Sequence, residues 1–109
     1  MTAAPAAPAV VPRKPPDFGP PPPGWQVARE YTWEKPGKRP VTLAWPDEVK
    51  ITGRRGATYR FIRYVDAPPA KGRRKRRQWI DVVGGTPGVT EFAAFCPDRI
   101  RSARKMRAR

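Results

Sequence analysis

Apolar residues along this chain recur at short, alternating spacings and not at the spacing of a helix. Between Trp25 and Cys96, prolines and glycines interrupt every apolar run before it reaches the length of an ordinary helix. The clearest alternation covers residues 58–65, where both faces carry bulky groups, as is typical of a central strand. The pattern predicts further short strands within residues 25–33, 41–43, 48–52, 78–83 and 89–96.

Turn-forming residues separate the predicted strands. Residues 53–56 predict a tight turn, residues 84–88 a hairpin connection, and residues 97–100 a single helical turn with proline near its start. About five short strands joined by such turns predict a mainly β fold, an SH3-like barrel whose closure removes exposed strand edges. An OB-type barrel is the alternative, although it needs somewhat longer strands than this chain offers.

Proline content divides the chain into three parts. Nine of the 16 prolines lie in residues 1–24, which hold few large apolar residues. This segment cannot bury enough surface to offset its ordering entropy, so we expect it to be disordered with polyproline II character. Residues 25–100 hold ten of the 11 aromatic residues and are the expected domain. Residues 101–109 are expected to be a basic tail, which either becomes helical on binding an anion or is a frayed terminus without a specific role.

The second half of the predicted domain resembles a known group of sequences. Residues 78–85 (QWIDVVGG), followed by residues 92–100 (FAAFCPDRI), resemble small uncharacterised proteins of actinobacteria and their phages. The likeness covers roughly residues 48–100 and implies an SH3-like barrel. Because the shared positions are turn and core residues, it implies no catalytic site.

Positive charge is concentrated in two short segments. The formal net charge is +14, and residues 71–77 and 99–109 carry +6 each. An unpaired buried cation costs several kcal/mol, so both segments must be solvated. A solvated cluster of this density attracts polyanions, and the arginine fork matches the oxygens of a phosphate.

These charges predict a protein that binds the phosphate backbone of nucleic acid, either non-specifically or by shape. The turn at residues 54–55 is expected to extend the basic surface toward the loop at residues 71–77. One of Tyr59, Tyr64, Trp33 and Trp45 could stack on a base, and Tyr64 is the expected one, because it precedes that loop. The expected contact residues are Lys71, Arg73, Arg74, Lys75, Arg76, Arg77, Arg101, Arg104, Lys105, Arg107, Arg109, Arg54, Arg55 and Tyr64.

Two other interpretations of the basic segments stay open. They can act as solubilising surface, or they can grip the acidic surface of a protein or a ribonucleoprotein. In the second case the chain is a bacterial or phage-encoded assembly module. Aromatic residues are expected mainly in the core, among them Phe61, Trp79, Phe92 and Phe95.

Missing residue types narrow the possible chemistry. With no histidine and a single cysteine, Cys96, the chain has no internal disulfide, no His/Cys zinc site and no histidine-dependent catalytic triad. Its acids form no recognisable pair motif, so we expect neither an enzyme nor a bound cofactor. The chain lacks an apolar stretch long enough for a membrane helix and a secretory signal, so we expect a cytoplasmic monomer.

Overall fold

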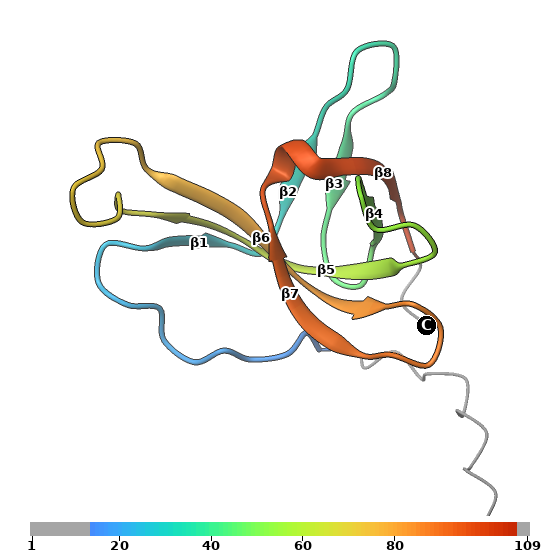
Figure 1. Ribbon diagram of the computed structural model, residues 1–109, viewed down its shortest axis with the longest axis horizontal. Helices are drawn as coiled ribbons and strands as arrows, with labels where there is room; N and C mark the ends of the chain where they lie inside the picture. The colour runs from blue at the N-terminus through green and yellow to red at the C-terminus, as the bar shows by residue number, and fades with distance from the viewer. Residues whose placement is uncertain (1–13, 107–109) are drawn as a thin grey trace, which may run out of the picture.

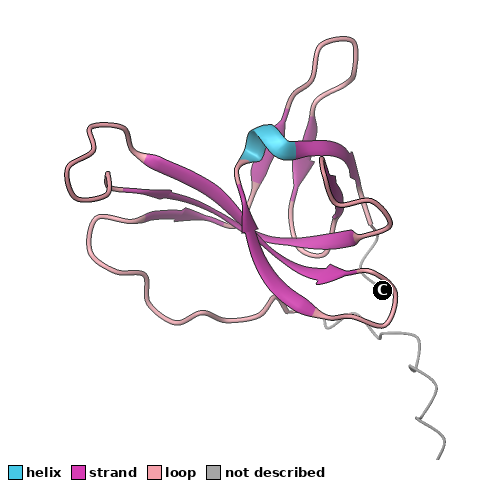
Figure 2. Cartoon of the chain, viewed as in Figure 1, coloured by secondary structure: helices cyan, strands magenta, loops and turns pink. Residues whose placement is uncertain are grey.

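The computed structural model describes residues 14–106, and their architecture is mainly β, as the alternating pattern predicts (Figures 1 and 2). The one helical turn of the described residues, η1, spans Pro97–Arg99, within the residues 97–100 for which the proline predicts it. The strands are β1 (Gln26–Ala28), β2 (Tyr31–Trp33), β3 (Val41–Leu43), β4 (Glu48–Ile51), β5 (Thr58–Ala67), β6 (Arg77–Gly85), β7 (Glu91–Phe95) and β8 (Ile100–Arg104).

One antiparallel sheet carries most of the structure. Its strand order is β7-β6-β5-β4-β8, while β2 and β3 form a separate hairpin. β6 pairs with β5 along its length, from Thr58 opposite Gly85 to Ala67 opposite Arg77. On the other side of β5, β4 pairs with the first part and β1 with the second. The second part of β5 therefore projects from the body in a three-stranded arm, formed with β1 and β6 (Figure 1).

The expected barrel is confirmed only as a mainly β fold. Among the described residues no pairing joins the edge strands β7 and β8, so the sheets are open. The expected start of the tail at residue 101 is wrong, since Ile100–Arg104 form β8 and pair with β4. Ile100 is buried in the core. The edge of β4 offers N–H and C=O groups that pair with residues 100–104 as a strand and that a helix here would leave without these partners.

The core fills the space between the curved sheet and the β2–β3 hairpin. Phe61, Ile80 and Val82 of the two long strands are fully buried, and Leu43 of the hairpin packs into the same cluster. Phe61 and Phe95 are core residues, as expected. Phe92 is 62% exposed, so its expected place in the core is wrong.

The segment before β1 crosses the sheet without regular secondary structure. The Phe18 ring packs edge-on against the Phe92 ring, with centroids 5.8 Å apart, and lies 4.3 Å from the guanidinium carbon of Arg63. Such contacts contribute about 0.5–1.5 kcal/mol each, and proline content alone does not reveal them. Residues around Phe18 therefore depart from the expected disorder, while residues 1–13 lie outside the described part.

Candidate nucleic-acid interface

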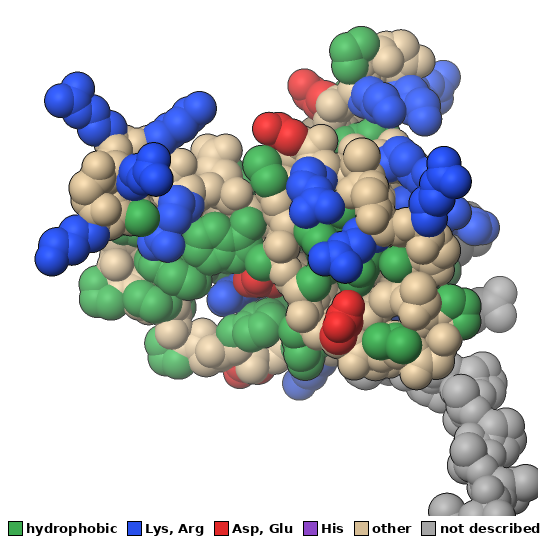
Figure 3. Space-filling model, in the orientation of Figure 1, with side chains coloured by type: hydrophobic (Ala, Val, Ile, Leu, Met, Phe, Trp, Pro, Cys, Tyr) green, Lys and Arg blue, Asp and Glu red, His purple; other side chains and the backbone are tan. Residues whose placement is uncertain are grey.

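The basic loop, residues 71–77, lies at the outer end of the arm, where the chain turns from β5 into β6 (Figure 1). The Trp25 and Trp79 rings meet edge-on in the arm, with centroids 5.1 Å apart. Val65 and Ala67 of β5 are fully buried. The loop is thus carried by a packed, hydrogen-bonded support, and lysine and arginine side chains project from it in several directions (Figure 3).

Two cations of the basic loop turn back onto the arm. The Arg76 Nε donates to the Asp66 carboxylate at 2.6 Å, and a terminal nitrogen of the same guanidinium contacts the Gly24 and Asp66 carbonyl oxygens. The Arg77 Nε donates to the Pro68 carbonyl at 3.1 Å, and its guanidinium carbon lies 5.8 Å from the Trp79 ring centroid. Arg76 and Arg77 therefore hold the base of the loop.

The other four cations of the loop have no such partner. The side chains of Lys71, Arg73, Arg74 and Lys75 make no hydrogen bond or ion pair with any of residues 14–106, and all four residues are exposed. We call these four residues the arm-tip cations. Their charge is uncompensated by the protein's own carboxylates, so it is available to an external anion.

The arginines of the β4–β5 turn lie at the other end of β5. Arg54 and Arg55 precede the first residue of this strand, and the basic loop follows its last residue. A strand of 10 residues is about 33 Å long. The expectation that this turn extends the basic surface toward the loop is therefore wrong, because the length of β5 separates the two.

The basic residues near the C-terminus lie in different environments. Arg101 and Arg104 lie exposed on β8, with no side-chain hydrogen bond or ion pair among the described residues. The Lys105 ammonium donates to the Asp47 carboxylate at 2.7 Å and to the Thr42 carbonyl at 2.8 Å. Lys105 thus ties the chain to the body, while Arg107 and Arg109 lie outside the described residues.

Tyr64 already stacks on another aromatic ring. Its ring lies on that of Tyr31 with centroids 4.9 Å apart and planes 23° from parallel, and both residues are partly buried. Burial raises the pKa of both phenols above the ordinary 10.0, and the charge of Asp66 adds to the rise at Tyr64. One face of Tyr64 is therefore occupied by Tyr31.

The raised pKa of these tyrosines predicts a loss of stability in alkali. Unfolded phenols ionise at their ordinary pKa, so the unfolded state loses protons first as the pH rises. The contribution is complete below about pH 10 and disappears as the pH passes the raised values. In urea titrations, Tyr64→Phe should lose less stability than the parent between about pH 9 and pH 11. An equal loss in both proteins would contradict this expectation.

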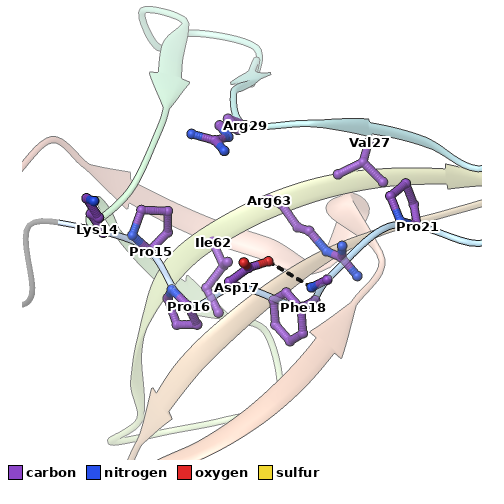
Figure 4. Close-up of a pocket in the computed structure, with 11 residues that line it drawn as sticks. Lys14, Pro15, Pro16, Asp17, Phe18, Pro21, Val27, Arg29, Ile62 and Arg63 are labelled. Carbon is purple, nitrogen blue, oxygen red and sulfur yellow. Dashed lines mark hydrogen bonds between the residues drawn. The ribbon is translucent and has the colours of Figure 1, made fainter.

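A hollow of about 430 Å³ separates the N-terminal segment from the sheet (Figure 4). Lys14, Pro16 and Phe18 line it on the segment, and Ile62 and Arg63 line it on β5. The Arg63 charge is balanced by the Asp81 carboxylate at 2.6 Å, which also accepts from the Trp79 indole. The charge of Arg63 is therefore compensated inside the protein, unlike the charges of the arm tip.

The sequence patterns did not predict which of these cations would have a partner inside the protein. Asp66 and Asp47 each hold one cation of the basic segments, and Arg99 lies beside Arg54 on one aromatic ring. Residues 14–106 contain no group of three His, Cys, Asp or Glu side chains placed to hold a metal ion. No helix in this part of the chain is long and apolar enough to cross a membrane.

Comparison with known proteins places the chain in a family. A family model described as a domain of unknown function (DUF7246) matches residues 20–109. The match includes the arm, the basic loop and the last proline-rich residues before β1. No curated protein and no solved structure matches the chain.

Proposed function

We propose that this chain, which belongs to the DUF7246 family, is a non-catalytic protein that binds the phosphate backbone of nucleic acid through its arm tip. The observation that carries the proposal is the absence of an internal ion-pair partner for Lys71, Arg73, Arg74 and Lys75 among residues 14–106. Four neighbouring cations on an exposed loop create a strong local attraction for a polyanion.

The chemistry of the loop favours phosphate over a single carboxylate. Arg73 and Arg74 each offer a planar fork that binds two phosphate oxygens at once, while Lys71 and Lys75 add compact charges. Contacts of this kind position a protein on nucleic acid without reading its bases. The proposed binding is therefore independent of sequence and strongly dependent on salt.

We further propose that the body is related to SH3-like barrels. Strands β4 to β7 follow one another as antiparallel neighbours, and β8 then returns, after the turn η1, to pair with β4. This order supports the proposal, and the arm is then an extension of two strands of such a body. In this arrangement the arm carries the basic loop outward from the core.

A pair of charge-matched variants tests the proposed function. Replacing Arg73, Arg74 and Lys75 with alanine removes three arm-tip cations and leaves the structural contacts of Arg76 and Arg77 in place. The control replaces Lys35, Lys38 and Arg39 with alanine, which removes the same charge from the exposed β2–β3 connection. Affinity for a labelled duplex is measured by fluorescence anisotropy over a series of salt concentrations.

We expect the arm-tip variant to bind at least about tenfold more weakly at low salt, with a log–log salt slope flatter by about 2–3. The control should lose much less affinity, because its cations lie away from the proposed contact. Equal losses in both variants would mean that only overall charge matters and would overturn the proposal. A partner captured from lysate that survives nuclease, with no binding to purified nucleic acid, would also overturn it.

A further inference from the structure

Two arginines from different segments cover one buried ring at the body end of the molecule. The guanidinium carbons of Arg54, from the β4–β5 turn, and Arg99, from η1, lie 5.7 and 5.1 Å from the centroid of the Phe95 ring. Phe95 is only 5% exposed and packs edge-on against Tyr59. A ring anchored in the core thus fixes two cations that are 45 residues apart in sequence.

Contacts with the backbone hold Arg99 further in place. One terminal nitrogen of its guanidinium donates to the Thr52 carbonyl at 2.9 Å. The following residue is Gly53, where an added Cβ would lie 3.5 Å from the same nitrogen. The side chain of Arg54 makes no hydrogen bond with residues 14–106, and neither arginine forms an ion pair within them.

This arrangement leaves hydrogen-bond donors available to an anion. A guanidinium that lies against an aromatic ring keeps the N–H groups at its edges free for in-plane hydrogen bonds. Two guanidinium groups held against one ring repel each other, and a bound anion relieves the repulsion. Phosphate oxygens match this geometry, because they accept two parallel N–H bonds from one guanidinium.

The spacing between this pair and the arm tip fits a regular polyanion. Arg54 lies before β5 and the arm-tip cations lie after it, so they are separated by at least the length of a 10-residue strand, about 33 Å. One turn of B-form DNA repeats its backbone about every 34–36 Å. A duplex lying along the arm would therefore present phosphates of successive turns to both places.

We propose that Arg54 and Arg99 form a second phosphate site, which contacts the same nucleic-acid duplex at least about one helical turn from the arm tip. This inference rests on the proposed function, and it adds that the ligand is a double helix long enough to reach both sites. A duplex shorter than one turn engages one site at a time.

Duplex length combined with a double variant tests the second site. The variant carries Arg54→Gln and Arg99→Gln, and the control carries Lys38→Gln and Arg39→Gln, which removes the same charge elsewhere. Each protein is titrated with blunt DNA duplexes of about 8 and about 20 base pairs, lengths below and above one helical turn. We expect the variant to lose about tenfold in affinity for the long duplex and less than about twofold for the short one.

Arg99→Gln also removes the hydrogen bond to the Thr52 carbonyl. Arg54→Gln alone is therefore measured as well, and its affinity should fall about threefold on the long duplex only. Circular dichroism melting confirms that each variant is folded. Equal losses on both duplexes, or none, would overturn the inference.

The outcomes separate this inference from the proposed function. If the parent protein binds neither duplex, the proposed function fails. If the parent binds both, and the arm-tip variant is weakened while Arg54→Gln with Arg99→Gln behaves as the parent, only the second site fails.

Discussion

Replacing Asp47 with alanine is expected to lower the free energy of unfolding by about 3 kcal/mol, because two backbone donors lose their acceptor. The Asp47 side chain is 2% exposed, and it accepts hydrogen bonds from the backbone N–H groups of Ala44 and Met106 at 2.9 and 2.8 Å. A buried donor left without a partner costs about 1–3 kcal/mol. Urea denaturation followed by tryptophan fluorescence measures the change.

Lys105→Ala is the matched control for Asp47→Ala. The Lys105 side chain is 60% exposed although its ammonium lies 2.7 Å from the Asp47 carboxylate. Only the Lys105 end of this pair is exposed, but the buried Asp47 carboxylate keeps its two backbone N–H donors in the variant, so we expect Lys105→Ala to lose about 1 kcal/mol, clearly less than Asp47→Ala. If Lys105→Ala were as damaging as Asp47→Ala, the ion pair, and not the backbone hydrogen bonds, would hold the C-terminal strand.

Gly84→Ala is expected to cost about 3–4 kcal/mol of stability, through steric strain in the middle of the sheet. Gly84 pairs with Tyr59 on one side and Glu91 on the other. Its φ is +145°, and an added Cβ would lie 2.4 Å from the Thr58 carbonyl oxygen and 3.0 Å from the Tyr59 Cα. Both contacts are with backbone, so relief would require β5 to separate from β6. Thermal and urea unfolding should both register the loss.

Gly88→Ala separates this steric effect from the general cost of a positive φ. Gly88 has a φ of +85°, but an added Cβ would meet nothing within 4 Å. We expect a loss of about 1 kcal/mol, due to backbone strain alone. Equal losses of stability in Gly84→Ala and Gly88→Ala would show that contact with the Thr58 carbonyl oxygen adds nothing to the cost at Gly84.

Local patterns in the sequence were sufficient to predict the long strands and the turns. The alternating residues 58–65 lie inside β5, and residues 78–83 lie inside β6. Both strands could be predicted because a strand buried on both faces carries bulky groups at successive positions. Residues 84–88 correctly predicted a hairpin between β6 and β7, although Gly84 and Gly85 belong to β6 itself, and the proline at residue 97 correctly predicted a helical turn. These features depend on residues adjacent in sequence.

Features that depend on distant partners could not be predicted in this way. Ile100–Arg104 form a strand because β4 has an open edge, although the composition of this segment favours a helix. Phe92 stays outside the core because β7 is an edge strand and Phe18 packs against its ring. The pairing of Arg76 with Asp66 likewise depends on the register between β5 and β6.

The arm also determines how the molecule meets a charged surface. Arg63, near the middle of β5, is neutralised by Asp81, whereas the arm-tip cations stand at one extreme of the protein. At physiological ionic strength an electric field decays over about 8 Å, so a polyanion pulls first on the nearest exposed charges. If the proposed function holds, we expect the resulting torque to turn the molecule tip-first before contact. Such steering makes the association rate, as well as the affinity, sensitive to salt.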